Sequence, residues 1–176
     1  MFKCSLVQPN FAQGNNSYFS YWLPHSLACV YVYTAYAEGY RDLFEINQIV
    51  YKRESIESLL PKMIADDIVL FSNYMWNWEY NKRLASALKS QNPAVKIIFG
   101  GPQVSEHRLS EQQSEMPYVD TFIVSEGELS FRQYVDDLIE SGEPGSVYDT
   151  KRLDDLDIPS PYLEGFFDAL LRDNPD

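Results

Sequence analysis

The chain of 176 residues is poor in the side chains that usually bind metals. It has two cysteines, Cys4 and Cys29, and two histidines, His25 and His107. Neither cysteine belongs to a CxxC or CxxxCxxC spacing, so the sequence offers no ligand set for an iron–sulfur cluster or a zinc ion. Both cysteines are predicted to be structural thiols, since free cysteine is among the most buried residue types.

Positive charge and long apolar runs are also scarce. The chain carries 14 lysines and arginines against 26 aspartates and glutamates, a net charge of −12. A protein that binds a phosphate backbone needs the opposite sign, which argues against a nucleic-acid partner. No apolar run approaches the ~20 residues of a membrane helix, and the start lacks the layout of a signal peptide. We therefore expect a cytoplasmic protein without a membrane partner.

Short apolar segments alternate with longer amphipathic ones along most of the chain. Strands are predicted for the following ranges: 3–7, 42–50, 68–71, 95–99 and 121–124. Helices are predicted between them and after the last, with the strongest periodicity in the following residues: Phe131, Tyr134, Val135, Leu138 and Ile139. Strands that alternate with helices predict a parallel sheet with right-handed crossovers.

The expected fold is a doubly wound α/β domain with a five-stranded parallel sheet and helices on both faces. The second segment alternates, with Phe44 apolar and Glu45 polar, which is typical of an edge strand. We therefore predict the flavodoxin-like strand order 2-1-3-4-5, with a long loop over 8–22. Residues 1–142 are predicted to form this domain. Residues 143–176, acidic and containing proline, are predicted to form a linker whose apolar turn at 166–171 has no evident cover.

In such a sheet, ligands bind outside the carboxyl ends of the strands, where the strand order reverses. The loops at that edge carry two adjacent glycines, which let a ligand approach the backbone, together with a serine hydroxyl and large aromatic surfaces. Each feature alone fits a turn or packing, but their joint placement favours a binding site. The candidate residues are Pro9, Asn10, Ser72, Asn73, Tyr74, Trp76, Asn77, Gly100, Gly101, Pro102, Gln103, Glu126, Gly127 and Glu128.

Several short segments together resemble the N-terminal cobalamin-binding domain of cobalamin-dependent radical S-adenosylmethionine (SAM) enzymes. They are Pro9-Asn10, Leu23-Pro24, Ser72 with Trp76-Asn77, Gly100-Gly101-Pro102 with Val104-Ser105, Glu126-Gly127-Glu128 and the tail 156–163. The resemblance implies a base-off cobalamin, whose corrin lies across the strand ends and whose nucleotide tail enters the sheet crevice. It implies that Ser72, Gly100 and Gly101 line the tail and that residues 73–78 border the corrin.

The sequence departs from that family in three places. The Asp-x-His-x-x-Gly motif that often supplies a cobalt ligand is absent from the loop 8–14, so we expect no histidine ligand there. Ser125 stands where many relatives have glycine. The cluster motif CxxxCxxC would lie beyond the tail, so the iron–sulfur cluster and S-adenosylmethionine belong to a domain absent from this chain. We expect an excised fragment, a shortened gene or one subunit of a split enzyme, with a radical SAM domain or subunit as partner.

A domain of this fold could serve four functions. The favoured one is a cofactor module for methyl transfer or related radical chemistry, not catalytic alone. The main alternative is a non-catalytic interaction module that has lost the cofactor, which differs only in whether cobalamin binds. A flavodoxin-like electron carrier is disfavoured, because residues 9–12 are not a hydroxyl-rich phosphate loop. A signalling receiver is disfavoured, because Gln8 and Ser72 stand where acidic residues are needed.

Overall fold

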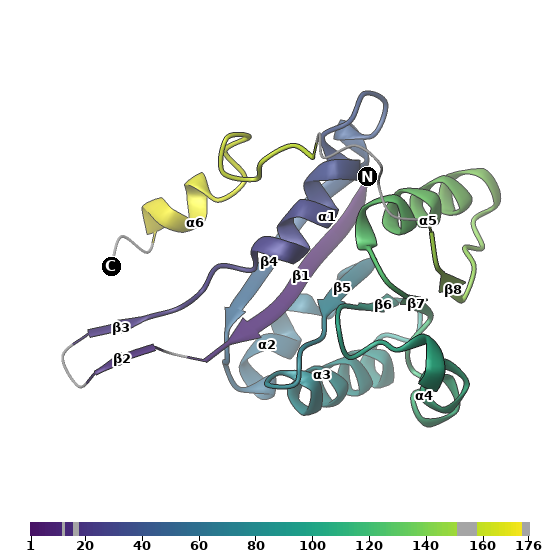
Figure 1. Ribbon diagram of the computed structural model, residues 1–176, viewed down its shortest axis with the longest axis horizontal. Helices are drawn as coiled ribbons and strands as arrows, with labels where there is room; N and C mark the ends of the chain where they lie inside the picture. The colour runs from purple at the N-terminus through teal and green to yellow at the C-terminus, as the bar shows by residue number, and fades with distance from the viewer. Residues whose placement is uncertain (12, 16–17, 151–157, 174–176) are drawn as a thin grey trace.

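The computed structural model describes residues 1–11, 13–15, 18–150 and 158–173 (Figure 1). It shows an α/β fold around a six-stranded parallel sheet. From one edge to the other, the strands are β4 (Phe44–Lys52), β1 (Phe2–Asn10), β5 (Ile68–Ser72), β6 (Lys96–Gly100), β7 (Thr121–Ile123) and β8 (Val147–Tyr148). The predicted doubly wound fold is confirmed, and the alternating segment is the edge strand β4 as expected.

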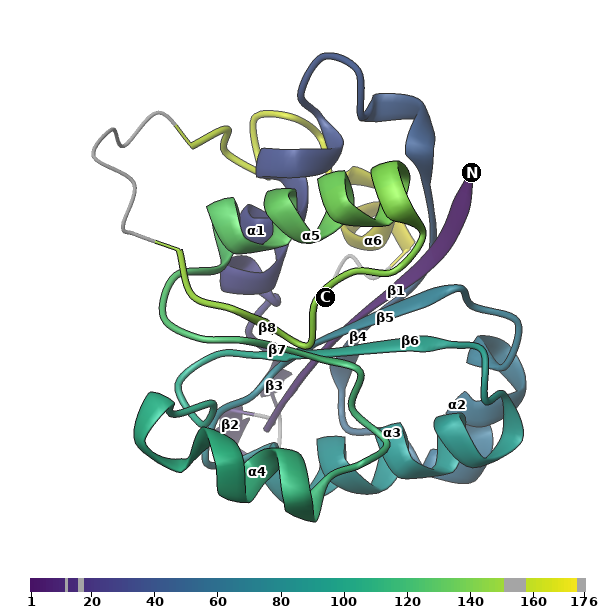
Figure 2. The same cartoon turned by 90° about the vertical axis from the view of Figure 1, so that its right-hand side faces the viewer.

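Helices cover both faces of the sheet, as Figure 2 shows. On one face lie α1 (His25–Ala35) and α5 (Gly127–Ser141). On the other face lie α2 (Ile56–Met63), α3 (Trp78–Gln91) and α4 (Leu109–Glu115). Two short 3₁₀ turns, η1 (Arg41–Leu43) and η2 (Glu106–Arg108), lie in the connections. None of the helices in the described ranges is long and apolar enough to span a membrane.

The central strand β5 shows why both faces need cover. All five of its residues are buried. Because successive side chains of a strand point to opposite faces, Val69 and Phe71 pack in the core under α2 and α3. Ile68 and Leu70 pack in the core under α1 and α5. A continuous apolar run therefore becomes the middle of a three-layer fold.

Two details of the sheet differ from the sequence prediction. The sheet has six strands rather than five, because Val147–Tyr148 pairs with Phe122–Ile123 and extends the sheet beyond residue 142. The segment expected to be one long loop over 8–22 instead begins as the end of β1 and then forms a hairpin of β2 (Gln13–Asn15) and β3 (Tyr18–Ser20). Both features depend on pairing with other segments, which local periodicity does not reveal.

The segment 158–173 packs back onto the domain. The Phe166 ring lies 5.5 Å from the Tyr31 ring of α1, and Phe167 is 1% exposed. A short helix, α6 (Asp168–Asp173), follows. The expectation that the apolar turn at 166–171 has no cover is therefore wrong for its two phenylalanines. The start of the resembling tail, residues 156 and 157, lies outside the described residues.

We expect Phe167→Ala to release this segment from the domain. Truncating a buried phenylalanine removes about 3 kcal/mol of packing free energy, and a terminal segment can detach without global unfolding. The rate of limited proteolysis within 158–173 should rise about tenfold or more. Leu163→Ala is the matched control, because Leu163 is 89% exposed. Equal cleavage rates in the two variants would show that Phe167 does not anchor the segment.

Candidate functional site

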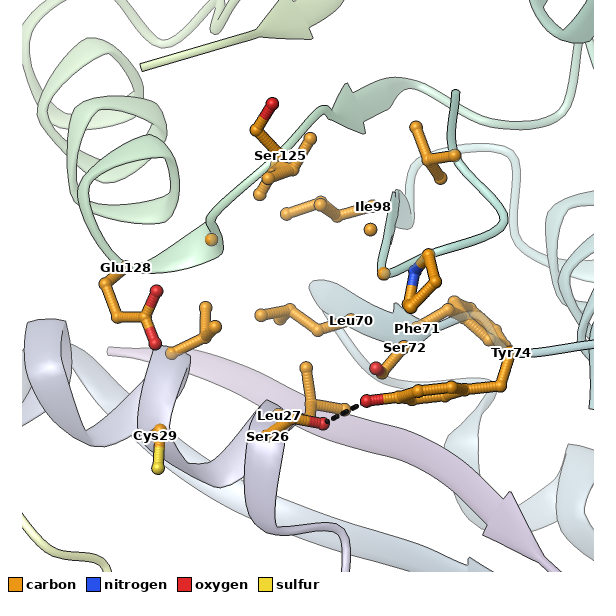
Figure 3. A pocket seen from close by; sticks show the side chains of 17 residues that line it. Ser26, Leu27, Cys29, Leu70, Phe71, Ser72, Tyr74, Ile98, Ser125 and Glu128 are labelled. Atoms are coloured by element: carbon orange, nitrogen blue, oxygen red, sulfur yellow. Dashed lines mark hydrogen bonds between the residues drawn. The ribbon is translucent and has the colours of Figure 1, made fainter. Parts of the chain in front are cut away.

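A cavity of about 400 Å³ opens at the carboxyl ends of β5, β6 and β7 (Figure 3). Its other walls come from the start of α1 and the start of α5. Small-molecule sites usually have volumes of about 300–1,000 Å³. The cavity lies beside the point between β1 and β5 at which the strand order reverses. This is the edge at which ligands bind in doubly wound sheets.

The sheet side of the cavity has two layers. On β5 and β6, an apolar residue is followed two positions later by a small or polar one at the strand end: Leu70 and Ser72, Ile98 and Gly100. On β7 the apolar residue is Ile123 at the strand end, and Ser125 follows it in the connection to α5. Residues two apart share one face of a strand, and the later one is nearer the carboxyl end. We call Leu70, Ile98 and Ile123 the deep layer and the other three the rim.

Helix α1 completes the apolar interior. Leu27 and Val30 line the cavity from the helix. Figure 3 shows the side chains of Leu27, Leu70 and Ile98 directed into the same space. The interior of the cavity is therefore apolar on both its sheet side and its helix side.

One end of the cavity is closed by a chain of hydrogen bonds. The Tyr74 hydroxyl lies 3.1 Å from Ser26 Oγ, as the dashed line in Figure 3 shows. Ser26 Oγ donates to Gln8 Oε1 at 3.0 Å, and Gln8 Oε1 also accepts the backbone N–H of Leu27 at 3.3 Å. These bonds join β1, α1 and the loop after β5 into one wall.

The Ser72 hydroxyl is the unused polar group of this end. Ser72 is 6% exposed and lines the cavity, and its hydroxyl makes no hydrogen bond to any residue that the structure describes. Its oxygen is not among the fully buried polar atoms without a partner, so it stays accessible from the open cavity. A ligand in the cavity could satisfy it.

The opposite end of the cavity is lined by Glu128 and Cys29, and the sulfur of Cys29 points away from the cavity in Figure 3. Glu128 belongs to the first turn of α5, and its side chain points toward α1 in Figure 3. Burial, and then the charge of Glu128, raise the pKa of the Cys29 thiol above its usual value. Cys29 Sγ lies 3.5 Å from His25 Nε2. Across the described ranges, no three His, Cys, Asp or Glu side chains gather to hold a metal ion.

Three buried asparagines hold the loop after β5. Asn73 Nδ2 donates to the carbonyl of Gly100 at 3.1 Å, and Asn81 Nδ2 donates to Asn73 Oδ1 at 2.9 Å. Asn77 accepts the N–H of Tyr74 at 2.8 Å and donates to the Ser72 carbonyl at 3.1 Å. Asn73 and Asn77 therefore position the loop from behind and do not line the cavity. Asn81 was missed, although a polar residue on the apolar face of a helix is a signal for such a role.

The aromatic residues of this loop lie at the outer edge of the site. Trp76 stacks on Tyr74 with ring centroids 4.5 Å apart and meets Phe11 edge-on at 6.0 Å. Its indole N–H donates to Asn10 Oδ1 at 3.2 Å, and Asn10 Nδ2 donates to the Trp22 carbonyl at 2.8 Å. The loop and the end of β1 thus form one partly exposed aromatic surface beside the cavity.

The structure divides the candidate residues into two groups. Those that line the cavity are Ser72, Tyr74, Gly100, Gly101, Pro102, Gly127 and Glu128. Those outside its lining are Pro9, Asn10, Asn73, Trp76, Asn77, Gln103 and Glu126. Sequence reasoning missed the wall from α1 and the apolar interior, which consist of Ser26, Leu27, Cys29, Val30, Leu70, Phe71, Ile98, Val104 and Ile123. Ser125, which the sequence analysis names only as a departure from the family, also lines the cavity. On β5 and β6, the residue two positions before the strand end could have been identified as part of the deep layer.

The glycines of the site serve chain packing as well as any ligand. Gly101 has φ +91°, and a Cβ there would lie 2.7 Å from the backbone nitrogen of Asn73. A Cβ on Gly127 would lie 2.7 Å from Val30 Cγ2, so this glycine lets α5 approach α1. A Cβ on Gly100 would make only ordinary contacts, the nearest at 3.5 Å. Ser125, with φ +62°, adopts the left-handed conformation that favours glycine.

Two curated proteins are similar to the chain, and no family model matches it. The chain is 27% identical over 164 residues to the cobalamin-dependent radical SAM methyltransferase TokK of Streptomyces tokunonensis. This match covers 84% of the present chain and 24% of TokK. The chain is also 26% identical over 90 residues to the 2-(S-pantetheinyl)-carbapenam-3-carboxylate methyltransferase of Streptantibioticus cattleyicolor. This second match covers 51% of the present chain and 13% of that methyltransferase. The chain thus matches about a quarter of the length of the first and less of the second.

We expect Gly101→Ala to destabilise the domain and Gly100→Ala to leave it almost unchanged. The first substitution places a Cβ against the backbone of Asn73 in a left-handed conformation, which alone costs about 1–2 kcal/mol. Its free energy of unfolding in urea should fall by about 2 kcal/mol or more. Gly100→Ala, the matched control, should change it by less than about 1 kcal/mol. Equal losses of unfolding free energy in the two variants would mean that the close contact with Asn73 is not the reason for a glycine at position 101.

Proposed function

We propose that the chain holds a base-off cobalamin at the carboxyl ends of its strands, as the cofactor-binding module of a cobalamin-dependent radical SAM enzyme. The observation that carries this proposal is the position and layering of the cavity. It opens beside the strand-order reversal, its interior is apolar, and a hydroxyl without a hydrogen bond to any described residue lies at its rim. The similarity to two methyltransferases, one of which is named as cobalamin-dependent, supports the same cofactor.

The residues present fit the nucleotide tail of this cofactor. The tail ends in an aromatic base, which suits the deep layer and the apolar side of α1. The sugar and phosphate that precede the base are hydrogen-bonding groups. They suit the rim, where the Ser72 hydroxyl is available and Gly100 leaves room for a close approach. A cavity of about 400 Å³ has room for a tail of this kind and not for the corrin itself.

The corrin would then rest outside the cavity, on the aromatic surface of the loop after β5 and the end of β1. Trp76 is 39% exposed and Phe11 is 50% exposed, so both offer apolar surface to a large macrocycle. Asn10 fixes the indole of Trp76 by a hydrogen bond. Asn73 and Asn77 would not touch the corrin themselves, because their hydrogen bonds hold the backbone of the loop that carries Trp76.

The cobalt of a bound cofactor would have no histidine ligand from the loop after β1. That loop contains no histidine in residues 8–24. His25 lies at the start of α1, where its ring stacks on Tyr162 at 5.5 Å. His107 lies in η2 and is exposed. Neither residue lines the cavity.

For the whole protein we propose methyl transfer with a radical SAM domain or subunit as partner, because both similar proteins are named methyltransferases. Bound cobalamin would supply the carrier of the methyl group. This chain would bind and orient the cofactor and exclude water from its tail. We further propose that residues 143–176 connect this module to its partner, although Val147–Tyr148 also belongs to the sheet.

Titration of the purified chain with hydroxocobalamin and methylcobalamin tests the proposal. We expect uptake of about one equivalent and a visible spectrum of the base-off form, because the base is buried in the protein rather than bound to cobalt. Circular dichroism of the same sample controls for folding. A folded chain that takes up neither compound would contradict the proposal and favour an interaction module of the same fold.

We expect Ser72→Ala to weaken cobalamin binding about three- to tenfold. The substitution removes one hydrogen bond worth about 1 kcal/mol and leaves the size of the cavity almost unchanged. Ser110→Ala is the control, because Ser110 is exposed on α4 and lies outside the cavity lining. Dissociation constants are measured by the same absorption titration. Equal constants for the two variants would remove Ser72 from the proposed site.

A further inference from the structure

We infer that the cavity selects among corrinoids by the base at the end of the tail, accepting an apolar benzimidazole and disfavouring a purine. The inference rests on the proposed function, because it concerns the same site. It adds a specificity that follows from the chemistry of the cavity wall.

The deep layer offers a base no hydrogen-bonding side chain. Leu70, Ile98 and Ile123 face the interior from the sheet, and Leu27 and Val30 face it from α1. The backbone groups of the strands are also engaged. β5 pairs with β1 on one side and with β6 on the other. A base in the deep layer therefore meets carbon atoms on both of its faces.

The polar groups of the cavity lie at its two ends rather than in its interior. The hydroxyls of Ser26 and Tyr74 are already bonded to each other. Ser72 lies at the rim, where the strand ends, and is nearer the sugar than the base. At the other end, Glu128 carries a carboxylate, which only accepts hydrogen bonds when it is ionised. It cannot satisfy the ring nitrogens of a purine, which are acceptors too.

A purine buried here would lose hydrogen bonds to water without replacement. The nitrogens of its six-membered ring bind water in solution, and each buried acceptor without a donor costs free energy. Only the amino group of an adenine could find a partner, the Glu128 carboxylate at one end of the cavity. A dimethylbenzimidazole base carries methyl groups at the corresponding edge and gains from burial. We expect a cobamide with an adenine base to bind at least about tenfold more weakly than cobalamin.

The test compares three corrinoids in the absorption titration of the full chain: hydroxocobalamin, the corresponding cobamide with adenine as base, and cobinamide, which has no base. Tenfold or stronger preference for hydroxocobalamin over the adenine cobamide supports the inference. Equal affinities of these two, both above that of cobinamide, would overturn the selectivity while leaving the proposed function intact. Failure of all three to bind would overturn the proposed function itself.

One variant locates the selectivity in the cavity wall. Val30→Thr replaces a methyl group by a hydroxyl of nearly the same size in the apolar interior, where it can bond to a purine nitrogen. The ratio of the dissociation constant for the adenine cobamide to that for hydroxocobalamin should fall about threefold or more. Val147→Thr makes the same change on β8, a partly buried position outside the cavity, and should leave the ratio unchanged. An unchanged ratio in both folded variants would contradict the assignment of the selectivity to the apolar interior.

Discussion

The close approach of two chain segments at the ends of β5 and β6 determines the shape of the site. Asn73 follows β5, and its backbone N–H and side-chain amide both donate to the carbonyl of Gly100. The Asn73 carbonyl in turn accepts the N–H of Gln103. These bonds bring the loop so near the end of β6 that residue 101 has no room for a Cβ. Because the loop is fixed there, Tyr74 reaches Ser26 and closes one end of the cavity.

Much of the fold could be predicted from the sequence, because hydrophobic periodicity depends on neighbouring residues. The continuous run at Ile68–Ser72 predicts a buried strand, and the alternation at Phe44–Lys52 predicts an edge strand. Val147–Tyr148 is too short to carry a pattern, and it is a strand only because β7 lies beside it. Likewise, Phe167 is buried by aromatic residues of its own segment packed onto α1, which no local pattern shows.

The candidate site was predictable at the level of loops and less so at the level of side chains. The strand order places Ser72 and Gly100 at the carboxyl edge of the sheet, and ligands generally bind at that edge in doubly wound sheets. Whether a residue in such a loop faces the cavity or the chain behind it depends on contacts between distant segments. Asn77 turns toward backbone groups of its own loop, whereas Glu128 lines the cavity. Sequence alone ranks these two residues equally.

The net charge of −12 bears on how the proposed cofactor would be held. A tail that contains a phosphate is repelled by an acidic protein at long range, and among the residues that the structure describes no lysine or arginine lines the cavity. Affinity must then come from burial of the aromatic base, at about 25 cal/mol for each Å² of apolar surface, and from the rim. The same apolar interior that supplies the affinity leaves a more polar base unsatisfied. Affinity and selectivity in this site would thus have one physical origin, the deep layer of Leu70, Ile98 and Ile123.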